Sequence, residues 1–326
     1  MEVFLRIVLK ASYYVAIVFA ILPVSYNNIT HRFIKSKALC FYNKLLTFIV
    51  LFVLPGISIS EFQQNSATRP LSDVTLNFFM IQNIVQWMSF SQLYYSIGRK
   101  VNELIEILNE GIDLMKSVNH TTKLPIRSFI WVLLKHFIVD IFFNLFLIML
   151  ILNFSTDFKN CFSCLVMLFV TANKFFSNFY LMSLHFNAFL LEKVHCKMEK
   201  VLKTIENCRS FKHDITKHQY DCICNDASDK IDEISIQYSE ISHFVYKSSK
   251  LFPLAVIYSL NYSFVNLLGF WFLLFTLMKL NMINSLDTFL ANRRFWYIIF
   301  YYIFSESINL YSFIQACDCM KLKVLI

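Results

Sequence analysis

Histidine and cysteine, the side chains most often used to bind metals, gather in one short stretch, HDITKHQYDCIC, at residues 213–224. The spacing of His213, His218, Cys222 and Cys224 matches no common zinc site. The sequence also lacks the HxxxH and HxxHH pairs of membrane di-metal enzymes, the phosphate-binding GxxxxGK[ST] motif and the nucleophile motif GxSxG. We therefore predict no metal site, no cofactor and no enzymatic activity.

Polar and charged side chains inside long apolar segments are the second candidates for chemistry. Each costs free energy in lipid, so it must face protein or water. In one segment, His136, Asp140 and Asn144 lie at positions i, i+4 and i+8, along one face of a helix. Lys174 lies near the middle of another segment, where a buried ion pair with Asp140 or with Glu306 would compensate its charge.

Two interpretations of these polar residues stay open. They could be hydrogen bonds and ion pairs that hold helices together. They could also line a polar and aromatic cavity, open to the outside, which is the usual form of a site for small molecules. The second interpretation predicts a ligand pocket formed by Asn83, Gln86, Asn144, Lys174, Tyr262, Asn266, Tyr301 and Glu306.

The composition indicates the class of protein that positions these residues. Of the 326 residues, 57% are hydrophobic and 16% are charged, whereas a soluble domain carries roughly a quarter of charged residues. Several apolar segments approach the length of about 20 residues that a bilayer crossing needs. We predict an all-α integral membrane protein, a bundle of six transmembrane helices at about 41–60, 74–97, 128–153, 160–191, 251–278 and 294–317.

The distribution of the net charge of +8 indicates an orientation rather than nucleic-acid binding. Lys and Arg gather before the first crossing, after the second and after the fourth, so the N-terminus is predicted to be cytoplasmic. Residues 1–40 form a cytoplasmic region with a half-buried helix at about 11–24, for which a signal peptide is the alternative. Residues 41–191 hold crossings one to four, 192–250 are cytoplasmic, and 251–326 hold crossings five and six and a short tail.

The cytoplasmic segments carry helical patterns of their own. Apolar residues recur at helical spacing between Val101 and Met115, so the second crossing continues beyond the membrane. Region 192–250 carries two apolar seams and is predicted to be a helical hairpin, either packed on itself or serving subunit assembly. The seams are Val194, Met198, Val201, Ile205 and Cys208, followed by Ile231, Ile234, Tyr238, Ile241 and Val245.

Three stretches carry a resemblance to a known family. The run ASYYVAIVFAILPVSYN contains Leu22, Pro23 and Tyr26. The second crossing runs into a basic amphipathic stretch in NFFMIQNIVQWMSFSQLYYSIGRKVNELIEILN, and the chain closes on SINLYSFIQACDCMK. Over nearly its whole length the sequence resembles the insect gustatory receptors.

This resemblance implies a function and an assembly. Such receptors have seven helices and a cytoplasmic N-terminus, and they resemble insect olfactory receptors. They form homo- or heterotetrameric, ligand-gated cation channels in the plasma membrane of chemosensory neurons. The ligand, a small-molecule tastant, binds in the outer halves of helices two to six, and the cytoplasmic extensions join the subunits around the central axis.

One part of the family pattern is missing. The seventh helix of these receptors lines the pore and carries a Thr-Tyr pair followed by Gln-Phe, and neither dipeptide occurs in this sequence. We therefore expect an incomplete gene product, or a non-conducting relative, that alone gives no ligand-evoked current. An insect olfactory receptor, a transporter and a structural membrane protein remain alternatives, whereas the charge distribution opposes a G-protein-coupled receptor.

Overall fold

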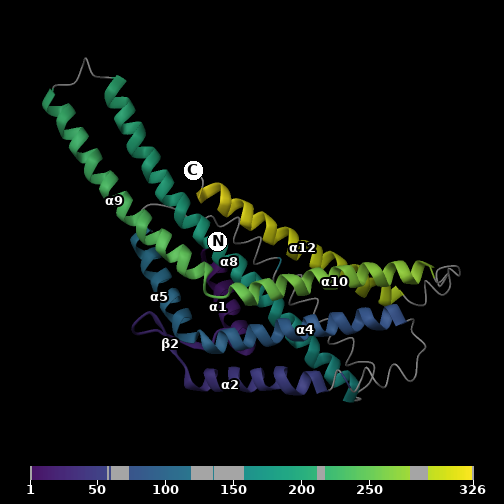
Figure 1. Ribbon diagram of the computed structural model, residues 1–326. Helices are drawn as coiled ribbons and strands as arrows, with labels where there is room; N and C mark the ends of the chain where they lie inside the picture. Colours follow the sequence, from purple (N-terminus) through teal and green to yellow (C-terminus); the bar gives the residue numbers. More distant parts are fainter. Residues whose placement is uncertain are drawn as a thin grey trace.

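The computed structural model describes residues 2–56, 59, 73–118, 135, 158–210, 217–279 and 293–324 (Figure 1). Nearly all of these residues are helical, as the predicted all-α class requires. In chain order the elements are α1 (Glu2–Val18), β1 (Val24–Asn27), β2 (Arg32–Lys35), α2 (Lys37–Phe48), the π-helical turn η1 (Ile49–Val53), α4 (Asp73–Arg99), α5 (Val101–Val118), α8 (Phe158–Ser210), α9 (Lys217–Ser249), α10 (Pro253–Lys279) and α12 (Arg293–Val324).

Three helical stretches among the described residues are long and apolar enough to cross a membrane: Lys37–Gly56, Cys164–Arg209 and Pro253–Thr276. They coincide with the predicted first, fourth and fifth crossings. Helices α4 and α12 occupy the predicted second and sixth crossings. The third, 128–153, lies outside the described residues except for Lys135. The number of six crossings and their orientation therefore stay predictions.

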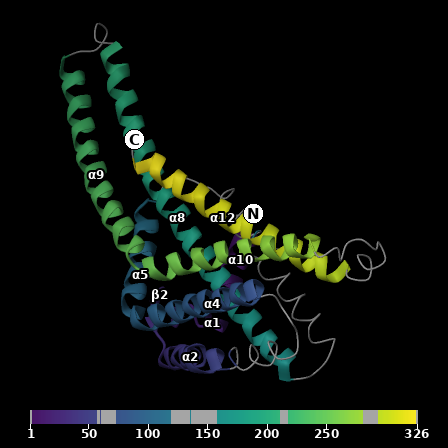
Figure 2. The ribbon, with the colours of Figure 1, turned by 45° about the vertical axis from the view of Figure 1, so that its right-hand side comes forward.

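Helices α4, α10 and α12 lie side by side, and α8 runs obliquely against them (Figures 1 and 2). Helix α8 contains 53 residues, which at 1.5 Å per residue gives a length of about 80 Å. It joins the predicted fourth crossing to the predicted cytoplasmic extension without a break. A single continuous helix therefore connects the polar residues around Lys174 to the paired α8 and α9 segments at the C-terminal end of α8.

That far end of α8 pairs with α9 along the predicted seams, in the arm that extends beyond the other helices (Figure 2). The predicted seam residues Val201, Ile234 and Ile241 are buried. The prediction is wrong at Tyr238, whose residue surface is 48% exposed. Its neighbour Gln237 faces α8 instead and accepts a hydrogen bond from Lys197 at 2.7 Å.

The N-terminal region differs from the predicted helix at about 11–24. Helix α1 begins earlier and ends at Val18. Its end is a Schellman motif, in which the Ile21 N–H donates to the Ala16 carbonyl at 2.8 Å and the Ala20 N–H to the Ile17 carbonyl at 2.9 Å. Ala20 adopts φ 53° in place of the usual glycine. It is fully buried, so its methyl group also packs against the core.

After this turn the chain forms an antiparallel hairpin of β1 and β2, which the sequence pattern did not predict. Asn109 of α5 holds the hairpin through backbone hydrogen bonds. Its Oδ1 accepts from the Phe33 N–H at 2.8 Å, and its Nδ2 donates to the Phe33 carbonyl at 3.0 Å. Arg32 forms an exposed ion pair with Asp113 at 2.9 Å. The hairpin therefore lies on α5 as an additional layer.

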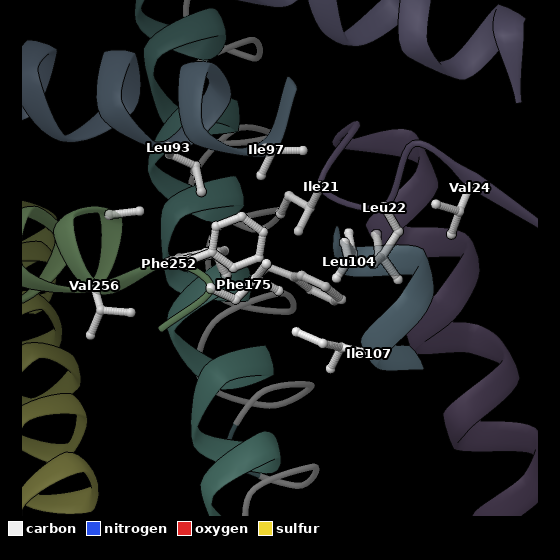
Figure 3. Close-up of a cluster of buried hydrophobic side chains, with 14 of the residues drawn as sticks. Ile21, Leu22, Val24, Leu93, Ile97, Leu104, Ile107, Phe175, Phe252 and Val256 are labelled. Carbon is white, nitrogen blue, oxygen red and sulfur yellow. The ribbon is translucent and has the colours of Figure 1, made fainter. Parts of the chain in front are cut away.

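The largest apolar core lies where the N-terminal region meets the helices of the body. Figure 3 shows Ile21 and Leu22 close to Leu104 of α5, and Phe175 of α8 in the middle of the cluster. Phe252, just before α10, lies beside them and packs edge-on against Phe176 at 5.7 Å between ring centroids. This core fixes α8 in relation to α1, α4, α5 and α10, and so fixes the polar residues that α8 carries.

Candidate functional site

The centre of the candidate site is a buried ion pair between α8 and α12. The Lys174 Nζ lies 3.0 Å from the Glu306 Oε1, and the two side chains are 2% and 0% exposed. Lys174 also donates a hydrogen bond to the Ser305 Oγ at 2.7 Å, and Asn309 donates to the Glu306 Oε2 at 3.5 Å. Of the two ion pairs that the sequence allowed, the Lys174–Glu306 pair is confirmed, whereas Asp140 lies outside the described residues.

Two tyrosines of α12 cover the Lys174 ammonium. The Nζ lies 6.0 Å from the Tyr301 ring centroid and 5.5 Å from that of Tyr302, so the negative faces of the rings attract its charge. Tyr302 stacks on Phe270 of α10 at 4.7 Å, and its hydroxyl donates to the Met167 sulfur at 3.0 Å. The charge is thereby covered by aromatic rings of α12, which Phe270 of α10 and Met167 of α8 hold in place.

A second polar layer joins α4 to α10, closer to the Asp73 end of α4. The Gln82 Nε2 donates to the Asn266 Oδ1 at 2.7 Å. The helices approach closely here because Gly269 has no side chain: a Cβ at that position would lie 2.8 Å from the Phe78 ring. Deeper in the bundle, Ser89 donates to the Asn173 Oδ1 at 3.2 Å. Polar groups therefore connect α4, α8, α10 and α12 across the site.

The structure brings together most of the predicted site residues. Lys174, Tyr262, Asn266 and Glu306 are buried, and Tyr301 is half-buried. They come from α8, α10 and α12, and Tyr262 packs against Phe90 of α4 at 5.9 Å between ring centroids.

The predicted residues of α4 fit less well. Asn83 is exposed and Gln86 is half-buried, while Gln82, which the prediction omitted, makes the contact with α10. Leu93 and Ser89 are buried and so mark the face of α4 that points into the bundle. Gln86 and Gln82 lie seven residues, or about two helical turns, before them and therefore on the same face. Asn144 lies outside the described residues.

No group of three or more potential metal ligands occurs in the part of the chain that the structure describes. Cys222 and Cys224 of α9 are exposed free thiols, and His213 lies outside the described ranges. What the arrangement around Lys174 offers is a fixed cation and a fixed carboxylate in an aromatic surrounding. These groups can orient a polar molecule, and they can hold α8 and α12 together.

Comparison with known protein families relates the chain to a receptor family. A family described as 7tm chemosensory receptor matches residues 9–323, which is nearly the whole chain. No curated protein matches the sequence.

Proposed function

We propose that this chain, which belongs to the 7tm chemosensory receptor family, is a gustatory receptor subunit. Its ligand would be a polar, non-volatile small molecule that binds among α4, α8, α10 and α12. The subunit would act in the plasma membrane of chemosensory neurons as part of a tetrameric, ligand-gated cation channel.

The observation that carries the proposal is a cluster of polar side chains in the interior of the helical bundle. Asn266, Gln82 and the buried Lys174–Glu306 pair lie between aromatic side chains of several helices. Sites for small molecules combine apolar walls with a few placed polar groups in this way. Fixed charges favour a ligand with many hydroxyl or amine groups over an apolar odorant, which supports the gustatory over the olfactory alternative.

The proposed mechanism is a population shift. A ligand that binds better to one helix arrangement than to another shifts their equilibrium by its difference in binding free energy. The ion pair joins α8 to α12, so a ligand contact near Tyr301 or Asn266 would change the relative position of these two helices. Helix α8 would transmit the change to its far end beside α9.

The test separates ligand binding from conduction. The full chain is purified, and its thermal unfolding is followed with a panel of sugars, alkaloids and amino acids. We expect at least one of these compounds to stabilise the chain, and Asn266→Ala to weaken its binding roughly tenfold, the effect of one lost hydrogen bond. The matched control is Asn261→Ala, because Asn261 is an exposed residue of the same helix.

Two results would contradict parts of the proposal. Stabilisation that Asn266→Ala and Asn261→Ala weaken equally would place the ligand elsewhere. Ligand binding in the purified chain without any ligand-evoked current, in cells that express it with or without other receptor subunits, would contradict the channel role and leave the receptor role standing.

A further inference from the structure

A separate cavity of about 250 Å³ lies between α8 and the N-terminal region. Four residues of α8 border it at helical positions i, i+3, i+4 and i+7, on a face centred about a quarter of a turn away from Lys174. These residues are Phe175, Asn178, Phe179 and Met182, and the opposite wall includes Ser12 and Ala16 of α1, Phe33 of β2 and Leu108 of α5.

The walls of this cavity are fixed by hydrogen bonds to the backbone. The Tyr13 hydroxyl donates to the Val24 carbonyl at 3.3 Å and accepts from the Tyr26 N–H at 3.0 Å. Phe33 is held on both backbone groups by Asn109. Because these contacts tie α1 and the hairpin in place, the walls do not close over the space, and a ligand would enter a preformed site.

The lining selects an uncharged aromatic ligand. Rings of Tyr13, Phe33, Phe175 and Phe179 surround the space, and they favour stacked or edge-on contacts with another ring. The Asn178 side chain already accepts a hydrogen bond from Lys135 at 2.9 Å. The Ser12 hydroxyl is buried away from the cavity, whose surface is almost entirely apolar, so the described lining offers a ligand no free hydrogen-bonding group.

The volume sets the size of the ligand. An apolar cavity of about 150 Å³ stays dry and binds benzene, so by proportion this cavity holds roughly ten non-hydrogen atoms. We propose that it is a second binding site, distinct from the site around Lys174, for an uncharged, apolar aromatic molecule of about that size.

The experiment measures binding of two radiolabelled probes, 1-naphthol and naphthalene, to the full chain in lipid nanodiscs by equilibrium dialysis. Empty nanodiscs correct for uptake by the bilayer. We expect saturable binding of one equivalent per chain. Naphthalene should bind roughly three- to tenfold more tightly than 1-naphthol, because the apolar lining leaves the naphthol hydroxyl without a partner.

The control for this preference is Ser12→Ala. Because the Ser12 hydroxyl does not reach the cavity surface, this variant should bind both probes like the unaltered chain. Tighter binding of 1-naphthol than of naphthalene, lost in Ser12→Ala, would overturn the proposal.

Filling the cavity tests its location. Ala16→Leu adds three carbon atoms from α1 and should abolish binding of both probes; Leu108→Phe, from α5, is the second variant if Ala16→Leu does not fold. Saturable binding that survives in a folded filling variant would overturn the proposal. So would its absence in the unaltered chain, or binding in detergent that disappears in nanodiscs, which would assign the cavity to a lipid acyl chain.

Discussion

The Lys174–Glu306 pair derives its stability from its neighbours. Taking each charge out of water costs several kcal/mol, and mutual attraction offsets this only where other polar groups complete the pair. Ser305 and Asn309 supply such groups, and two tyrosine rings cover the ammonium. The pair is therefore a selective contact between α8 and α12: it holds them strongly in one register and penalises any register that separates the charges.

A double-mutant cycle tests this interpretation. Lys174→Met leaves the Glu306 carboxylate buried and uncompensated, so we expect a loss of about 3–5 kcal/mol in the free energy of unfolding. Lys174→Met combined with Glu306→Leu removes both charges and should recover most of that loss. Thermal unfolding of the purified variants measures both effects.

The exposed Lys230–Asp226 pair of α9, at 2.6 Å, provides the comparison. Because solvent screens it, Lys230→Met should change stability by no more than about 1 kcal/mol. Additive effects of Lys174→Met and Glu306→Leu would mean that the two side chains act independently, against the contact observed here.

At the residue scale, the sequence was sufficient to find the buried charges but not to orient every helix. Lys174 and Glu306 stand out because charged residues in apolar segments must find partners. On α4 the segment is apolar on several sides, so periodicity does not distinguish Gln82 from Asn83. The burial of Ser89, seven residues further on, and the contacts with α10 decide that Gln82 faces inward, where Gly269 allows the close approach.

At the scale of elements, helices were predictable and the small hairpin was not. Each strand of the hairpin has four residues, and its turn depends on local polar contacts: the Asn27 Oδ1 accepts from the Ile29 N–H at 2.8 Å. Its docking depends on Asn109, which lies 76 positions from Phe33. A pattern so short, stabilised from so far away, gives no periodic signal.

Asn109 is therefore predicted to be the main fixing point of the hairpin. Asn109→Ala removes two hydrogen bonds to the Phe33 backbone and should destabilise the docked hairpin by about 1–3 kcal/mol. Hydrogen exchange of residues 24–35 should accelerate by one to two orders of magnitude, while α10 keeps its protection. Asn102→Ala, which removes only an exposed contact with Lys35, is the control and should leave exchange unchanged.

Helix α5 is also held to α9, through Lys247. The Lys247 ammonium lies 2.6 Å from the Glu106 carboxylate and 3.0 Å from the Glu110 carboxylate. These hydrogen bonds, the one to Glu106 most strongly, raise the pKa of Lys247 above its usual 10.5. A raised lysine pKa means that the stabilisation is complete below pH 10.5 and is lost only as pH rises through the higher folded-state value. The contact is therefore constant over the physiological range.

At the scale of the whole molecule, one contact places two of the predicted cytoplasmic segments on the same side of the body. The Lys100 Nζ, after α4, donates to the Lys250 carbonyl, before α10, at 3.1 Å. The sequence assigned both positions to the cytoplasmic side from charge alone, and the structure places them together. The C-terminal end of α8 and the start of α9 extend from this same side of the body (Figure 1).

The final prediction concerns the orientation of the entire chain. With the N-terminus and the α8–α9 arm on the basic side, a tag at residue 1 and a tag between Ser210 and Lys217 should both be stained only after permeabilisation of cells that express the protein. A tag between Lys279 and Arg293, at the opposite end of α10, should be stained on intact cells. The reason is that the positively charged segments remain in the cytoplasm. Staining of the first two tags on intact cells would contradict the predicted orientation. The Asp73 end of α4 and the Lys279 end of α10 would then face the cytoplasm, so the polar site could no longer be assigned to the outer half of the membrane.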